Sequence, residues 1–295
     1  MKHFLEINQL SYDTITRLLQ RAMAFKSQHT YPQFQGRALA NLFYEPSTRT
    51  RISFEMAAKN LGIRVVNVDT ASSAENKGEV IEDTIQNLFA MGITHFVLRH
   101  KQGGMPQSIA GTSSFGAHII NAGDGAHAHP SQALLDMMTI LSHKPNLKRL
   151  KIAVVGDVLH SRVASSFQKM CMMMGVGELV LVAPEIWHPN SPAFGRVTSS
   201  LQDGIVDADV VITLRVQKER LHAKETMSLE DYHDTFAITK TTLAMAKPDV
   251  MIMHPGPINR GVEIDSDVAD GPHSYILEQV TNGIFMRMAI LEALM

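Results

Sequence analysis

Short apolar runs rich in β-branched residues alternate with helix-like segments from about residue 37 to the end of the chain. The strand-like runs lie at residues 38–44, 64–68, 95–98, 118–121, 151–155, 179–182, 210–214 and 250–253. Strands that alternate with helices in this way form parallel sheets covered by helices on both faces. The alternation therefore predicts an α/β protein.

Apolar periodicity identifies several of the intervening helices. In residues 80–89 the apolar side chains recur at helical spacing, while Glu82 and Asp83 occupy other faces. A second apolar stripe lies at residues 134–141, and Pro130 suits the first turn of that helix. A last helix is expected at about residues 275–294.

The chain has 295 residues and a mass of 32.6 kDa, which exceeds the usual size of one domain and indicates two. A polar segment at residues 143–150 separates a helix from the next strand, so we expect the domains to meet near it. We assign residues 1–133 to the first domain and 134–279 to the second, each a parallel sheet flanked by helices. We expect the helix at about 280–295 to pack back on the first domain.

Composition argues against several classes of partner. The net charge is −2, from 27 basic and 29 acidic residues, and the absence of a long basic block disfavours nucleic acid and anionic membranes. Neither a signal peptide nor a run of 18 apolar residues is present. The single cysteine, Cys171, excludes an internal disulfide and is expected to be a buried thiol. We expect a cytoplasmic protein.

Residues 45–51 read Glu-Pro-Ser-Thr-Arg-Thr-Arg and join a predicted strand to a predicted helix. Ser47 is a good N-cap residue, and the backbone N–H groups of the next three residues have no partner within the helix. Such a helix start favours an anion. Thr48 and Thr50 add hydroxyl donors, and Arg49 adds a planar fork that matches phosphate. The alternative is an ordinary capped helix that faces solvent, but the full string favours a phosphate-binding turn in an enzyme with a small phosphorylated substrate.

Other polar residues follow the predicted strands of the first domain, where open α/β sheets bind their ligands. Arg99 comes directly after the strand at residues 95–98, and a helix start carries His129 and Gln132. The alternating pair His127 and His129 also admits a metal site, but no cysteine or acidic cluster accompanies it, so we expect no metal. His127 has no assigned role.

In the second half, residues 154–157 end a strand and are followed by a turn that leads to Arg162. A strand, turn and helix in this order can hold a dinucleotide. The G-x-G-x-x-G spacing is absent, however, and we therefore do not expect a nicotinamide cofactor.

Two further strand ends carry polar residues. Arg215 and Gln217 follow the strand at residues 210–214 in a run with four charges in six residues, which by itself is usually a solvated face, although a bidentate arginine also suits a planar carboxylate. The prolines of residues 255–257 fix a rigid turn after the last strand, whose exposed backbone carbonyls can receive substrate N–H groups.

The string at residues 43–51 resembles the carbamoyl-phosphate signature of the aspartate and ornithine carbamoyltransferases, and the resemblance continues from about Phe4 to the carboxyl terminus. It implies a carbamoyl-phosphate-binding first domain, an amino-acid-binding second domain and an active site in the cleft between them. It implies no metal and no organic cofactor.

The resemblance also assigns roles to individual residues. It implies carbamoyl-phosphate binding by Ser47, Thr48, Arg49, Thr50, Ser73, Lys77, Arg99, His129 and Gln132, and catalytic stabilisation of an oxyanion by Thr50, Arg99 and His129. It implies aspartate binding by Lys77, Arg162, Arg215 and Gln217, and backbone carbonyl contacts from Gly256 and Pro257. Many members of the family have leucine at the position of Gly256, a minor departure because only the backbone is used there.

The aspartate and ornithine enzymes differ in the motifs that hold the acceptor. The ornithine enzymes carry Ser-Met-Gly and His-Cys-Leu-Pro motifs. This chain has neither motif; it has Arg215-Val-Gln217 and His-Pro-Gly-Pro at residues 254–257, with Glu45 before Pro46. The resemblance thus implies transfer of a carbamoyl group from carbamoyl phosphate to L-aspartate. The products would be N-carbamoyl-L-aspartate and phosphate, in de novo pyrimidine biosynthesis.

The polar segment at residues 72–79 resembles the loop that enters the neighbouring subunit's site in this family. It implies a homotrimer with shared active sites, and leaves open regulatory chains or a dihydroorotase as partners. Two alternatives remain for the whole chain. One is a paralogue that binds these ligands without turnover, and the other is a metal hydrolase built on His127 and His129.

Overall fold

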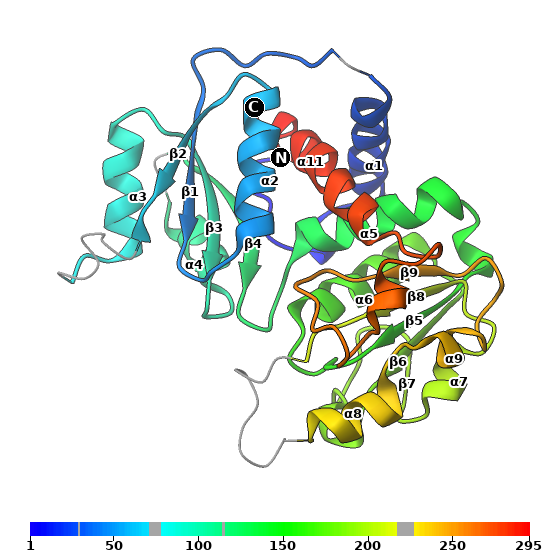
Figure 1. Cartoon of the computed structure of the whole chain (residues 1–295). Helices are drawn as coiled ribbons and strands as arrows, with labels where there is room; N and C mark the ends of the chain where they lie inside the picture. The colour runs from blue at the N-terminus through cyan, green and yellow to red at the C-terminus, as the bar shows by residue number, and fades with distance from the viewer. Residues whose placement is uncertain (29, 71–77, 114–115, 217–226) are drawn as a thin grey trace. The chain divides into compact units, whose positions relative to one another are not determined.

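The computed structural model describes residues 1–28, 30–70, 78–113, 116–216 and 227–295, and these fold around two parallel β-sheets (Figure 1). One compact unit comprises Met1–Met138 together with Val280–Met295, and the other comprises Thr139–Gln279. Every strand pairing in both sheets is parallel, so the predicted α/β class is confirmed. No described helix is long and apolar enough to cross a membrane.

The sheet of the first unit has four strands in the order β2-β1-β3-β4. The strands are β1 (Ala38–Phe43), β2 (Arg64–Val68), β3 (His95–His100) and β4 (His118–Asp124). From β1 the chain first adds β2 on one side and then continues with β3 on the other. The direction of sheet growth therefore reverses between β1 and β3, and the carboxyl ends of these two strands flank a crevice where α/β sheets bind ligands.

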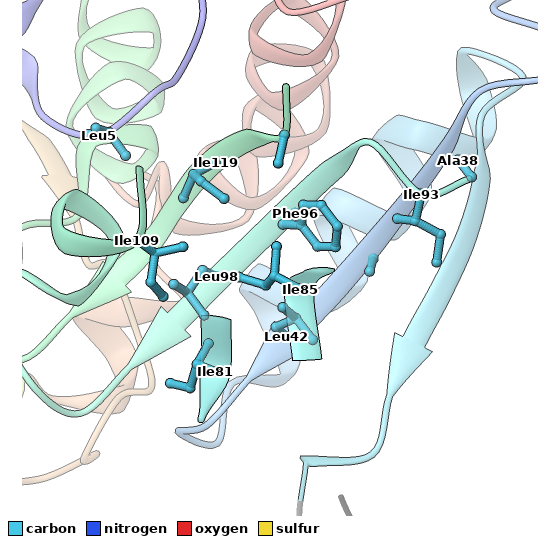
Figure 2. Packing of buried hydrophobic residues seen from close by; sticks show 12 residues of the cluster. Leu5, Ala38, Leu42, Ile81, Ile85, Ile93, Phe96, Leu98, Ile109 and Ile119 are labelled. Atoms are coloured by element: carbon cyan, nitrogen blue, oxygen red, sulfur yellow. The ribbon is translucent and has the colours of Figure 1, made fainter. Parts of the chain in front are cut away.

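One face of this sheet carries the core cluster shown in Figure 2. Ala38, Ala40 and Leu42 alternate along β1, as the two-residue period of a strand requires. They pack with side chains of β3 and with the apolar stripe of α3 (Ile81–Ala90), including Ile81 and Ile85. The stripe predicted at residues 80–89 is thus the buried face of a helix.

A second helix layer of this unit contains α1 (Tyr12–Ser27), α2 (Thr48–Asn60), α5 (Pro130–His143) and the C-terminal helix α11 (Ile276–Glu292), while α4 (Met105–Thr112) follows β3. Arg21 of α1 pairs with Glu292 of α11 at 2.6 Å. The guanidinium of Arg287 on α11 lies over the ring of Phe54 on α2, 5.0 Å from its centroid. Figure 1 shows α11, drawn in red, beside α1 and α2.

The sheet of the second unit has five strands in the order β7-β6-β5-β8-β9. Its strands are β5 (Lys151–Val155), β6 (Glu178–Val182), β7 (Arg196–Thr198), β8 (Val210–Thr213) and β9 (Met251–Met253). Its helices are α6 (Arg162–Met174), α7 (Leu201–Ile205), α8 (Leu229–Phe236), α9 (Lys240–Leu243) and α10 (Ser266–Ala269). Here the direction of growth reverses between β5 and β8.

Two differences from the predicted strands have physical causes. β7 was missed because it has only three residues, two of them polar, and it forms by pairing with β6 at the sheet edge. β3 and β4 continue past their predicted ends, because the polar residues His100 and Asp124 still pair across the sheet. Arg99 is consequently a residue of the strand itself rather than of the loop after it.

Candidate active site

The turn after β1 leads directly into α2, as the sequence predicts. Ser47 occupies the N-cap position, but its hydroxyl accepts no hydrogen bond from the first turn of α2. The first N–H groups of the helix therefore have no partner within the helix and receive no cap from Ser47. Thr50 is buried and lies in the same first turn.

Arg49 follows Thr48 at the start of α2 and presents its guanidinium at the molecular surface. Nearby protein atoms still exclude part of the water around it, and this desolvation lowers the pKa of Arg49 below its ordinary value. A partly desolvated cation beside an uncapped helix start attracts an anion, because both the charge and the helix dipole favour it.

Arg99 lies opposite this turn, on the neighbouring strand. Its register partner is Phe43, and its carbonyl accepts the backbone N–H of Tyr44 at 2.9 Å. Its guanidinium pairs with Glu45 at 3.1 Å and donates to the carbonyl of Ala122 at 3.3 Å. The side chain is buried, so Glu45 and Ala122 hold the cation at the carboxyl end of β3, next to the phosphate turn.

His129 and Gln132 lie at the start of α5, where both side chains are buried. The amide nitrogen of Gln132 donates to Asp136 at 2.9 Å. The amide oxygen of Gln132 is thereby oriented as an acceptor for a ligand N–H group. Asp136 was not selected from the sequence, although its separation of four residues from Gln132 on a helix is a usable signal.

In the second unit, Gly156 brings the ends of β5 and β8 together. Its φ is +136°, and a Cβ built there would lie 2.8 Å from the carbonyl oxygen of Leu214. The chain then reaches Arg162, the first residue of α6, which is buried. Here the N-cap Ser161 does cap its helix, since its hydroxyl accepts the N–H of Ala164 at 3.2 Å.

Arg215 follows β8, and the loop after β9 lies against the same segment: the Asn259 side chain donates to the carbonyl of Val216 at 3.4 Å. A fully buried pair, His254 and Glu263, holds this loop. The two side chains are 3.1 Å apart, and Glu263 also accepts the N–H of Asn259.

The other ring nitrogen of His254 accepts a hydrogen bond from the N–H of Gly256 at 2.8 Å. This bond holds the backbone at Gly256 and Pro257, whose carbonyls are the predicted contacts. Glu263 could not be selected from the sequence, because only the fold brings it to His254.

Three of the predicted site residues, Ser73, Lys77 and Gln217, lie outside the described residues. The described ones lie at or after the ends of the strands β1, β3 and β4 in the first unit and of β5, β8 and β9 in the second. Within the described chain no cluster of three or more His, Cys, Asp or Glu side chains is arranged to hold a metal ion. His127 instead contacts two carboxylates, Asp124 at 2.9 Å and Glu6 at 3.0 Å.

Two family models together match nearly the whole chain. Residues 2–142 match the carbamoyl-P binding domain of aspartate/ornithine carbamoyltransferases, and residues 148–294 match their Asp/Orn binding domain. The aspartate carbamoyltransferase catalytic subunit of Legionella pneumophila (strain Lens) is 60% identical over 294 residues, which cover 100% of this chain and 99% of that protein. The Coxiella burnetii (strain Dugway 5J108-111) protein of the same name is 46% identical, covering 98% of this chain and 95% of its own.

Solved structures agree with these matches. Aspartate transcarbamoylase from Trypanosoma cruzi, crystallised with carbamoyl aspartate and phosphate, superposes with a TM-score of 0.89 at 30% identity, covering 98% of this chain and 94% of that one. Ornithine carbamoyltransferase from Pyrococcus furiosus gives a TM-score of 0.87 at 27% identity, covering 98% and 96%. The chain belongs to the aspartate/ornithine carbamoyltransferase family.

Proposed function

We propose that this protein transfers the carbamoyl group of carbamoyl phosphate to the amino group of L-aspartate, giving N-carbamoyl-L-aspartate and phosphate. The observation that supports the proposal is that arginines stand at the reversal point of each sheet. Arg99 lies beside the start of α2, whose N-cap Ser47 does not cap it, while Arg162 starts α6 after β5 and Arg215 follows the neighbouring strand β8. Two anionic ligands, a phosphate and a dicarboxylate, match these two positions.

Carbamoyl phosphate binds to the first domain, which we place at residues 1–133 with the helix at about 280–295. Ser47, Thr48, Arg49 and Thr50 receive the phosphate at the start of α2, and Ser73 and Lys77 add to it from the loop before α3. Arg99 bridges the phosphate and the carbonyl oxygen. His129 donates to that oxygen, and the Gln132 amide oxygen accepts from the carbamoyl N–H₂ group.

Aspartate binds to the second domain, residues 134–279. Arg162 pairs with its α-carboxylate, and Arg215 with Gln217 holds the side-chain carboxylate, assisted by Lys77. The carbonyls of Gly256 and Pro257 receive substrate N–H groups. The fold alone does not select aspartate over ornithine, because both kinds of enzyme superpose almost equally well. The cationic Arg215 and the hydrogen-bond donor Gln217, which follow β8, select the anionic substrate.

The chemistry needs little beyond positioning and charge stabilisation. Holding the amino group against the carbamoyl carbon can lower the barrier by roughly 7–11 kcal/mol. Thr50, Arg99 and His129 stabilise the oxyanion that forms when the nitrogen–carbon bond is made, each such donor contributing about 3–4 kcal/mol. The carbon–oxygen bond to phosphate then breaks, and the departing phosphate accepts the proton of the amine. No metal or organic cofactor takes part.

The working form is a homotrimer in the cytoplasm, acting in de novo pyrimidine biosynthesis. Ile52 and Met56 expose 47% and 41% of their surface one turn apart on α2, and Val66 on the adjacent edge strand β2 exposes 41%. These exposed apolar side chains follow the turn at residues 45–51 and are suited to burial against a second copy. Sedimentation equilibrium tests this, with a mass of three chains expected and a monomer contradicting it.

Phosphate release from carbamoyl phosphate tests the function. We expect release only when L-aspartate is added, with no response to ornithine and no loss with a chelator. Release without an acceptor indicates a hydrolase, and loss with chelator indicates a metal enzyme. Release with ornithine alone indicates the other branch of the family, and binding without release indicates a paralogue that has lost turnover.

Substrate selection has a matched pair of variants. Arg215→Ala should raise KM for aspartate about 10- to 100-fold, because a hydrogen bond to a charged group contributes about 1.5–3 kcal/mol. Its affinity for carbamoyl phosphate should stay unchanged in calorimetry. Arg196→Ala is the control, since Arg196 is an exposed arginine of the same sheet that pairs with Glu178 and Asp203. Equal KM values in the two variants would contradict the role of Arg215.

A further inference from the structure

His127 lies between two carboxylates that come from distant parts of the first unit. Its Nδ1 is 2.9 Å from Oδ2 of Asp124, and its Nε2 is 3.0 Å from Oε1 of Glu6. The imidazole is 40% exposed, whereas Asp124 is 1% exposed. The ring therefore connects a buried carboxylate to one near the surface, and both of its nitrogens are engaged within the protein.

Both anchors of His127 are themselves fixed. Asp124 accepts the side-chain N–H of Asn121 at 2.9 Å and the backbone N–H of Gly104 at 2.7 Å. Glu6 belongs to the N-terminal segment, which is attached to β4 because the N–H of Phe4 donates to the carbonyl of Ile119 at 2.9 Å. A side chain held at both ends by fixed partners has little freedom to move.

The backbone next to His127 forms a closed turn that ends at the candidate catalytic histidine. The N–H of Asp124 donates to the carbonyl of Ala128 at 3.0 Å, and the N–H of His127 donates back to Asp124 at the same distance. Gly125 donates to the carbonyl of His100 at 3.0 Å, and a Cβ there would lie 2.8 Å from the backbone of Gly103. Ala128 directly precedes His129.

We propose that His127 is a positioning residue, which holds the turn between β4 and α5 so that His129 and Gln132 face the carbamoyl group. The inference rests on the proposed function and extends it to a side chain that touches neither substrate. Loss of the two His127 contacts removes the links of this turn to Glu6 and, through the imidazole, to Asp124. Catalysis is sensitive to this, because a displacement of about 1 Å at a reacting group can cost about 100-fold in rate.

Three variants test this role by steady-state kinetics. His127→Ala removes both contacts and should lower kcat about tenfold or more, with KM for aspartate unchanged. His127→Asn keeps a donor at the position of Nδ1, and so retains the contact with Asp124 and should recover most of kcat. Glu6→Gln keeps a weaker partner for Nε2 and should have the smallest effect.

The control variant is His143→Ala. His143 makes a similar contact with a carboxylate, 2.9 Å from Glu278, but at the last residue of α5. It should leave kcat unchanged. All four variants should melt within about 2 °C of the wild type, since contacts of partly exposed side chains contribute about 0.5 kcal/mol or less.

A readout that does not require turnover separates this inference from the proposed function. The imidazole NMR signals of His129, assigned with a His129→Gln variant, should shift in His127→Ala and return in His127→Asn. Unshifted signals would overturn the positioning role even if the wild type were inactive. So would a wild-type kcat in His127→Ala, or a parallel loss of kcat and melting temperature that His127→Asn does not restore.

Discussion

In both sheets of this molecule the direction of growth reverses once, yet the helices that start at the two reversal points are capped differently. In both, a helix starts just after a strand at the reversal point, α2 after β1 and α6 after β5. The hydroxyl of Ser161 accepts a hydrogen bond from the N–H of Ala164 in its own helix, whereas the hydroxyl of Ser47 accepts none from the first turn of α2. The N-cap side chain therefore leaves the first N–H groups of α2 available, whereas at α6 it already accepts from one of them.

The contrast explains why different side chains carry recognition in the two units. An open helix start supplies several converging N–H groups, which suit the three oxygens of a phosphate. A capped start supplies fewer, so an anion there must be bound by side chains such as Arg162, and a planar carboxylate is the matching ligand. We therefore propose that the different use of the two serine hydroxyls contributes to the choice of ligand in each unit.

The largest expected effect comes from removing the cation that faces the open helix start. Arg99→Ala should lower kcat at least about 100- to 1,000-fold, the usual cost of losing an oxyanion donor. Steady-state kinetics measure this loss. The control is Arg21→Ala, which removes the pair with Glu292 in the same unit and should leave kcat unchanged. If the Arg99→Ala variant keeps most of its turnover, Arg99 has no catalytic role and the proposed contrast between the two units fails.

The two units should also respond to acid in opposite senses. Burial lowers the pKa of His95 in the first unit to about 4, from 6.5, so the unfolded chain takes up this proton first. Stability should fall as the pH drops from 6.5 to 4, by about 3 kcal/mol in total. In the second unit, a hydrogen bond to Asp265 raises the pKa of His233. Its contribution is complete below pH 6.5 and is lost as the pH rises through the raised pKa.

Unfolding free energies from urea titrations between pH 4 and 8 test these signs. His95→Gln should flatten the decline on the acid side, and His233→Gln should flatten the decline on the alkaline side. The same pH profile for wild type and both variants would show that these histidines do not distinguish the units.

The smallest expected effects are those of replacing the two N-cap serines, Ser47 and Ser161, and they test the difference between the two helix starts most directly. Ser161→Ala should lower the free energy of unfolding by about 1 kcal/mol, the usual value of an N-cap, and leave carbamoyl-phosphate affinity unchanged. Ser47→Ala should do the reverse, with unchanged stability and an affinity about two- to tenfold weaker, since a neutral hydrogen bond contributes about 0.5–1.5 kcal/mol. Calorimetric binding and urea unfolding measure both quantities, and equal behaviour of the two variants would contradict the distinction.

Much of the fold could be predicted because it is encoded locally. Eight of the nine strands were predicted from apolar runs, and the position of Ser47 before α2 follows from its capping chemistry. β7 could not be predicted, since its three residues become a strand only beside β6. Whether Ser47 uses its hydroxyl as a cap is also invisible in sequence, because it depends on the backbone angles of the turn.

The candidate site likewise contains residues that could be predicted from the sequence and others that depend on the complete fold. Arg99 drew attention because it stands at the end of an apolar run, whereas Arg215 was selected through the family resemblance, which also supplied both roles. Their partners could not be selected. Glu45 reaches Arg99 through strand register, and Glu263 reaches His254 through the packing of a loop, so both depend on the complete fold.

The position of the C-terminal helix in the first unit determines which unit can complete its packing first during synthesis. The first unit contains residues 280–295, whose Arg287 lies over Phe54 and whose Leu294 carbonyl accepts a hydrogen bond from His95. During synthesis, the part of the chain made first must wait for the whole of the second unit before its own packing can be finished. The first unit is thus begun first and completed last, and the packing of α2 against α11 cannot form on a nascent chain that still lacks this helix.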